Sequence, residues 1–240
     1  MYYIKLAMIK FIQIIILMSA LVGYSQSNFL TGTDINNSAA SITSYNSGTY
    51  LNLGGSKATS KVKGTPYLFD NWNNISVVTT LDDQKFKIVN LNYDTKSDLF
   101  VAKISQDSVF MFKPNYLKEV TINNRRFKKY LNQETALFNY YEVIATNDEA
   151  EILKRNQKVL RIGITNRLTM EKESDYFILK EDYYLNKSGN LTELSIKKKN
   201  ILKLFGNKSQ TVKKFISDNK LSIKEDVDLR KIFNYYESLM

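Results

Sequence analysis

The chain of 240 residues contains neither cysteine nor histidine. Without cysteine it forms no disulfide and no thiolate metal site, and it is not a lipoprotein anchored through an N-terminal cysteine. Without histidine it lacks the base that activates the nucleophile in Ser-His-Asp and Cys-His enzymes. The catalytic chemistries that remain use carboxylate pairs, lysine or tyrosine bases, or calcium or magnesium held by oxygen ligands.

The first residues have the layout of a secretory signal peptide. A basic start precedes an apolar run over 11–22, and residues 23–25 offer small side chains at the −3 and −1 positions of a cleavage site. Lys10 and Gln13 keep the run short of the about 18 successive apolar residues that a transmembrane helix usually needs. We therefore expect a signal peptide over 1–25 and export to the periplasm, the outer membrane or the outside, with an uncleaved N-terminal anchor as the alternative.

The charge of the chain is strongly basic. The formal net charge is +10, and it falls to +8 once Lys5 and Lys10 leave with the signal peptide. Such a balance attracts nucleic acid, anionic lipid or acidic polysaccharide. However, lysine outnumbers arginine 28 to 6, whereas phosphate recognition favours the bidentate guanidinium group. Solvated lysines therefore explain the charge best, and we expect no nucleic-acid partner.

Composition divides the exported part into three regions. Residues 26–64 are rich in Ser, Thr, Asn and Gly and predict a flexible leader with one short strand near 49–53. Residues 65–196 alternate apolar segments with turn residues, at intervals too short for crossover helices. They predict an antiparallel β-meander sheet that is open, a sandwich or a half-barrel. The expected strands cover 75–80, 85–92, 99–105, 108–113, 119–122, 126–131, 138–146, 150–154, 176–186 and 191–196, and residues 155–175 stay unassigned.

The basic segment 197–240 changes to the 3.6-residue period of helices. We expect about three short helices, with Gly206 ending the first and Ser209 capping the second. Because such short helices are not stable alone in water, they should pack on the sheet or on one another. The whole chain therefore belongs to the α+β class. The expected buried residues of the three helices are Ile201, Leu204, Phe205, Val212, Phe215, Ile216, Leu229, Ile232, Phe233, Tyr236 and Leu239.

Two glutamates lie on strand faces that are otherwise apolar. Glu181 alternates with apolar and aromatic residues over 177–185, and Glu142 does so over 138–144. A carboxyl group among apolar side chains has a raised pKa, as a general acid requires, and two facing carboxyl groups form a hydrolytic pair. The simpler expectation is that a bulge turns either one outward or that an arginine or lysine pairs with it. We therefore assign no catalytic residue.

A short polar stretch has the oxygen atoms of a calcium site. Asn90, Asn92 and Asp94 alternate before a turn that ends at Asp98. The stretch lacks the glycine and the terminal glutamate of an EF-hand loop. Because Asn and Asp side chains usually cap turns, we expect no metal and no cofactor here.

Aromatic residues and lysines offer two further binding surfaces. Sixteen tyrosines and Trp72 include rings that suit the face of a sugar, although packing in the core explains them more simply. The helical tail has a basic face that suits anionic lipid, although a solvated face on a docked helix is the commoner outcome. The lysines of this face are Lys197, Lys198, Lys199, Lys203, Lys213 and Lys214.

Three stretches together resemble a known group of proteins. They are the opening 64–72, the pair 91–94 and 98–101, and the tail from 201 to 236. They are similar to exported, uncharacterised proteins of flavobacteria and related Bacteroidota, in which a signal peptide ending in Ser-Gln is also common. The resemblance implies a Gram-negative exported setting and brings no activity or catalytic residue.

These observations favour an exported, non-catalytic binding or structural protein of the bacterial envelope, with a protein or glycan partner that is not disulfide-linked. One alternative is a glycan hydrolase that uses Glu142 and Glu181. Another is a peripheral membrane or polyanion binder that acts through the lysine-rich tail.

Overall fold

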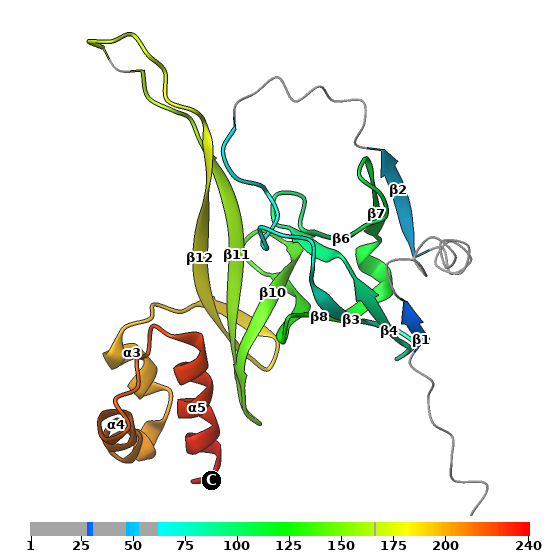
Figure 1. Cartoon of the computed structure of the whole chain (residues 1–240). Helices are drawn as coiled ribbons and strands as arrows, with labels where there is room; N and C mark the ends of the chain where they lie inside the picture. The colour runs from blue at the N-terminus through cyan, green and yellow to red at the C-terminus, as the bar shows by residue number, and fades with distance from the viewer. Residues whose placement is uncertain (1–27, 31–46, 53–61, 166) are drawn as a thin grey trace, which may run out of the picture.

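The computed structural model describes residues 28–30, 47–52, 62–165 and 167–240, which form two β-sheets and a C-terminal group of helices (Figure 1). The predicted signal peptide and most of the predicted leader lie outside these residues. In the part of the chain that is described, no helix combines the length and the apolar character needed to cross a membrane. The α+β class with antiparallel sheets and three C-terminal helices is confirmed.

The larger sheet has nine strands in the order β1-β4-β3-β8-β9-β10-β11-β12-β13. Its neighbouring strands are antiparallel except β1 and β4, which pair in parallel. The strands are β1 (Asn28–Leu30), β3 (Ile75–Thr80), β4 (Lys85–Val89), β8 (Leu117–Ile122), β9 (Arg125–Asn132), β10 (Leu137–Thr146), β11 (Glu151–Arg161), β12 (Tyr176–Lys187) and β13 (Asn190–Glu193).

The smaller sheet interrupts the expected meander. Its four strands lie in the order β2-β7-β6-β5, and the chain returns from it to the larger sheet when β8 pairs with β3. The single strand expected over 85–92 was wrong, because Asn90 has a positive φ of 61° and ends β4 there. The strands are β2 (Gly48–Asn52), β5 (Leu91–Asp94), β6 (Leu99–Lys103) and β7 (Ser108–Phe112), and the 3-10 turn η1 (Pro114–Tyr116) leads to β8.

A first hydrophobic core joins the smaller sheet to one part of the larger sheet. Aromatic side chains make its centre, and the rings of Tyr93 and Phe100 stack with centroids 5.0 Å apart. Phe127 from β9 and Tyr140 from β10 complete this group. The sheets are therefore held together by alternate residues that point inward from both, as in a β-sandwich.

The C-terminal helices make a second core against β10, β11 and β12. The helical elements are α3 (Lys198–Lys203), the 3-10 turn η2 (Gly206–Lys208), α4 (Ser209–Asp218) and α5 (Asp226–Glu237). Residues expected to be buried, among them Ile201, Val212 and Phe233, are inaccessible in this core. The prediction that Ser209 caps the second helix was wrong, because η2 runs directly into α4 and leaves Lys208 at the N-cap position without a side-chain bond.

The two longest strands form a ribbon that projects from the molecule. β11 and β12 pair along their whole length, from Glu151 with Asn186 to Arg161 with Tyr176 (Figure 1). The hairpin continues beyond them to a bridge between Thr165 and Lys172. Part of the unassigned stretch 155–175 is therefore strand. We call residues 158–165 and 167–179 the arm.

Candidate functional site

Glu142 lies where the two hydrophobic cores meet. On the same face of β10, Tyr140 belongs to the first core and Ile144 to the second. The strand has a bulge between Val143 and Ala145, which comes after Glu142 and leaves the glutamate facing inward. Its side chain is only 3% exposed. A carboxylate in such a position requires partners.

Arg125 and Asn156 hold both oxygens of Glu142. The Arg125 guanidinium donates from Nε to Oε1 at 2.8 Å and from Nη2 to Oε2 at 2.5 Å, in a two-pronged arrangement. Asn156 on β11 adds a bond from Nδ2 to Oε2 at 3.0 Å. The guanidinium also lies 5.3 Å from the ring centroid of Phe69, so the ion pair is covered by the first core.

Lys154 connects this ion pair to the helices. Its ammonium group lies 3.7 Å from Oε2 of Glu142 and 3.0 Å from Oε1 of Glu181, and it donates a short hydrogen bond to Asp226 at the start of α5. Asp226 also accepts a bond of 2.8 Å from the Tyr183 hydroxyl. Only 5% of the lysine side chain is exposed, so three carboxylates converge on one buried cation.

The surroundings shift the pKa values of two members of this cluster. Burial alone lowers the pKa of Lys154, but the neighbouring Glu142, Asp226 and Glu181 raise it above the ordinary lysine value. Burial and the bond to Asp226 raise the pKa of the Tyr183 hydroxyl well above that of a free tyrosine. Lys154 is therefore a charged structural link, not a neutral base.

The structure brings the two glutamates named from the sequence to the same lysine, and it occupies both oxygens of Glu142 and one of Glu181. Glu181 and Glu142 share the ammonium group of Lys154. Both oxygens of Glu142 accept hydrogen bonds from Arg125 or Asn156, so neither is open to a ligand. The sequence suggested that an arginine or a lysine pairs with the glutamates, and the structure contains both kinds of pair. Through Lys154 these pairs also link the sheet to α5.

The residues weighed as calcium ligands form structural hydrogen bonds instead. Asn92 is fully buried and binds the backbone of Phe69 through both its side-chain oxygen and its amide group. Asp94 caps a turn by accepting bonds from the backbone of residues 96 and 97, and Asp98 accepts a bond of 2.9 Å from Asn139. Among the described residues, no three Asp or Glu side chains come together as a metal site.

The structure also places Trp72 and the tail lysines, which the sequence offered as binding surfaces. Trp72 is half-buried and packs edge-on against Tyr67, with ring centroids 4.6 Å apart. Tyr140 and Tyr141 are core residues, as the sequence suggested for tyrosines in strands. The six lysines of the tail's basic face are all exposed, while the apolar residues of the same segment face the second core.

The arm is a surface that the sequence did not single out. Its outer part exposes large apolar side chains, with Ile164 at 76%, Met170 at 77% and Leu168 at 94%. Ile162 and Leu160 continue this surface toward the body at 65% and 42%. The stretch was missed because it shows neither a clean strand alternation nor a helical period. The only available signal was its high content of apolar residues between two clear strands.

Comparison of the chain with protein-family models, with curated proteins and with solved structures found no match.

Proposed function

We propose that this chain is an exported, non-catalytic binding or assembly protein of the bacterial envelope, which docks a partner protein through the arm. The observation that carries the proposal is the exposure of Ile162, Ile164, Leu168 and Met170 at the end of a projecting ribbon. Several large apolar side chains exposed in one short segment favour an interaction site, because exposing them to water is unfavourable unless a partner covers them.

Charges beside the apolar residues support a protein partner over a lipid bilayer. Glu173 donates its backbone N–H to the carbonyl of Ile164, and Asp175 accepts the N–H of Gly163, so acidic residues stand next to the apolar ones. An acidic side chain in the centre of a bilayer costs about 2.5–3.5 kcal/mol. The arm also carries basic residues, and the Lys172 ammonium lies 3.2 Å from Asp175. A protein surface that offers charges of both signs fits this mixture better than the interior of a bilayer.

A hydrolytic role is less well supported, although Glu142 and Glu181 converge. A retaining or inverting pair needs one carboxyl group to donate a proton and a free face on which water or the nucleophile attacks. Arg125 and Lys154 neutralise Glu142 and occupy both of its oxygens with Asn156, so Glu142 is not placed to perform either step. Glycan turnover by the purified protein that disappears in Glu142→Gln while folding is retained would establish the hydrolase instead.

Binding of anionic lipid through the helical tail is the remaining alternative. Its support is the exposure of six lysines in one segment. It predicts salt-sensitive sedimentation with vesicles of anionic lipid, lost on changing Lys213 and Lys214 to glutamine.

Export itself rests on the pattern of residues 1–25. The protein isolated from its native cell should begin after Ser25, as N-terminal sequencing would show. A soluble intracellular pool that keeps Met1 would contradict the envelope setting.

The docking role is tested with a pair of matched variants. Ile164→Ser with Met170→Ser removes apolar surface from the arm, and Leu137→Ser with Phe138→Ser removes apolar side chains that are each 61% exposed on the body. Tagged full chains are used to recover proteins from the native envelope, and the recovered protein is then purified and titrated back.

We expect one protein to bind the wild type and the body variant, and its affinity for the arm variant to fall about tenfold or more. Equal affinity for all three chains would refute the arm as the docking element. Loss of binding to protein-free vesicles in the arm variant would show a lipid partner instead.

A further inference from the structure

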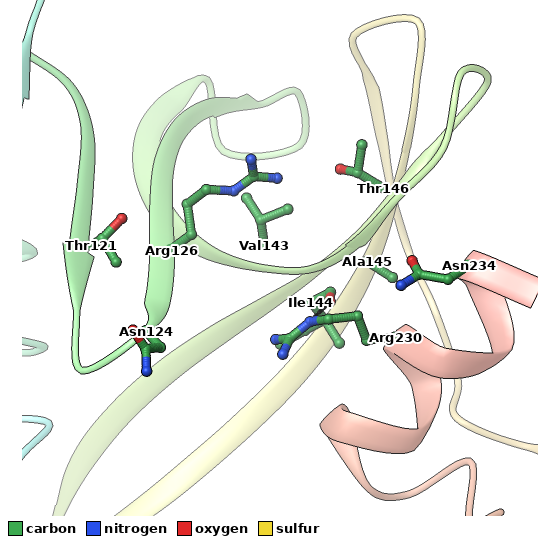
Figure 2. Close-up of a pocket in the computed structure, with 9 residues that line it drawn as sticks. All are labelled: Thr121, Asn124, Arg126, Val143, Ile144, Ala145, Thr146, Arg230 and Asn234. Atoms are coloured by element: carbon green, nitrogen blue, oxygen red, sulfur yellow. Dashed lines mark hydrogen bonds between the residues drawn. The ribbon is translucent and has the colours of Figure 1, made fainter. Parts of the chain in front are cut away.

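A second surface feature lies directly beside the bulge in β10. A hollow of about 460 Å³ is open between the β8–β9 hairpin, β10 and α5. Figure 2 shows Arg126 reaching in from β9 and Arg230 from α5. Two of the six arginines of the chain therefore line one hollow, and none of the described residues that line it carries a carboxylate.

The bulge positions Arg230. Nε of Arg230 donates a hydrogen bond of 3.1 Å to the carbonyl oxygen of Ile144, the residue at which the strand pairing shifts. Bulges of this kind redirect groups next to binding sites. With Nε held, the two terminal nitrogens of the guanidinium remain for a ligand. Among the described residues, no carboxylate lies within ion-pair distance of this arginine.

Arg126 supplies a second positive charge. Its nearest acidic partner is Glu119, whose Oε2 lies 3.9 Å from Nε, beyond hydrogen-bond distance. This loose contact leaves the planar guanidinium available for a carboxylate, which it binds through two parallel hydrogen bonds. Each arginine thus adds a positive charge to the lining of the hollow, which favours an anionic ligand.

The rest of the lining selects hydroxyl groups. Asn124 and Asn234 bring amide groups from opposite sides, and Thr121 and Thr146 add hydroxyl groups (Figure 2). The Thr146 hydroxyl donates a bond of 3.3 Å to Glu151, so toward a ligand it can act as an acceptor. Amide and hydroxyl groups both donate and accept hydrogen bonds, which suits the alcohols of a sugar. Val143 and Ala145 contribute apolar surface for the C–H face of a ring, and the volume lies within the range of small-molecule sites.

We propose that this hollow binds an acidic sugar, with the carboxylate between Arg126 and Arg230 and the hydroxyl groups on the asparagines and threonines. The hollow shares no residue with the arm, so a failed test of sugar binding would leave the docking role unaffected, and the reverse also holds. The ligand class follows from combining Arg230, Arg126 with its loose contact to Glu119, and four neutral polar side chains.

The test uses isothermal titration of the full-length mature chain with glucuronate and galacturonate. Glucose, galactose and inorganic phosphate are the comparison ligands. Arg230→Gln and Arg126→Gln each remove one charge from the hollow, and Arg161→Gln removes the same charge from the arm. Circular dichroism and thermal unfolding confirm that each variant is folded.

We expect the sugar acids to bind at millimolar concentration or below, with affinity that falls as salt is added. Each hollow variant should weaken binding about tenfold or more, and Arg161→Gln less than about twofold. Equal binding of neutral sugars, tighter binding of phosphate, an equal loss in Arg161→Gln, or no binding of either sugar acid up to about 10 mM would overturn the proposal.

Discussion

Lys154 links the sheet to the C-terminal helices through ion pairs. Its ammonium group reaches Glu142 on β10, Glu181 on β12 and Asp226 on α5. A buried ion cluster of this kind contributes little net stability compared with a well-packed apolar one, but losing one member leaves the others uncompensated. The cluster therefore favours one arrangement of the helices on the sheet more than it adds to the overall free energy of folding.

Replacing Lys154 tests this view. Lys154→Met keeps most of the volume but leaves three carboxylates without their shared cation, and we expect the free energy of unfolding to fall by at least ~2 kcal/mol. Glu142 keeps Arg125, which holds the loss below that of an isolated buried charge. Urea unfolding followed by circular dichroism measures the change.

Lys158→Met is the matched control, because Lys158 lies on the same strand face and pairs with Asp70, which is 85% exposed. Its loss should be under ~1 kcal/mol. Equal losses of unfolding free energy in the two variants would show that the buried cluster contributes no more to stability than the ion pair of Lys158.

The sequence predicted the strand face on which a residue lies better than it predicted the partners of that residue. It placed Glu142 correctly on a buried face, because strand alternation depends on local order alone, whereas Glu181 is exposed. It did not identify Arg125 or Asp226, because their contact with the cluster depends on strand register and on how α5 docks. Such contacts lie between residues 17 and 72 positions apart.

At the scale of the elements, the ribbon of β11 and β12 has two different parts. Near the body its residues join the second core, as Ile152 does. Further out, the two strands pair mainly with each other, and their large side chains are exposed. Strand pairing without burial gives little stability, so the arm should open more readily than the rest of the sheet.

The sequence defined the strands that have a buried face, since their alternation was clear. It failed for 155–175, because from residue 159 outward most of the ribbon is exposed on both faces and shows no alternation. It failed again at Asn90, because asparagine accepts both positive and negative φ, so nothing in the residue itself marks the point where the chain changes sheets.

Gly163 offers a way to disturb the arm alone. A Cβ at this position would lie 2.0 Å from the carbonyl oxygen of Glu173, so Gly163→Ala must push the two strands apart. We expect faster amide hydrogen exchange over residues 162–175 and a change in the free energy of global unfolding below ~0.5 kcal/mol. Hydrogen exchange measured by mass spectrometry gives the local effect over residues 162–175, and urea unfolding gives the global free energy.

Thr165→Ala serves as the control, because the Thr165 side chain is exposed and the substitution keeps the backbone bridge to Lys172. It should leave exchange over 162–175 nearly unchanged. A large loss of global stability in Gly163→Ala would mean that the arm is part of the cooperative core.

At the scale of the whole molecule, stability depends on groups that titrate far from neutral pH. The chain has no histidine, so no ordinary side chain changes charge between about pH 6 and 8. Burial and neighbouring carboxylates raise the pKa values of Tyr93, Tyr130 and Tyr183, and burial raises that of Tyr140. The folded state should therefore be insensitive to pH near neutrality and sensitive to alkali.

The direction of the alkaline effect follows from these shifts. A group whose pKa is raised in the folded state stabilises the protein below its unfolded value, and that stability is lost as the pH rises further. The unfolded values are 10.0 for tyrosine and 10.5 for lysine, so the loss should begin near pH 10 and involve Tyr93, Tyr140 and Lys154.

Urea unfolding at a series of pH values measures this profile. We expect a plateau between about pH 6 and 9 and a steep fall above about pH 10. Glu151 behaves in the opposite way. Burial alone would raise its pKa, but hydrogen bonds from Tyr130 and Asn186 lower it, so its contribution is lost as the pH falls below the ordinary glutamate value of 4.5. A stability maximum above pH 10 would contradict the burial of the tyrosines.

The arm as docking element is the central functional claim, and contact at its tip tests it most directly. A photo-crosslinking amino acid replaces Met170 on the arm or, as the control, Leu137 on the body, which is 61% exposed. After illumination in the native envelope, we expect the probe at 170 to trap one discrete protein that the probe at 137 does not. No trapped protein at 170, or the same mixture at both positions, would contradict the account.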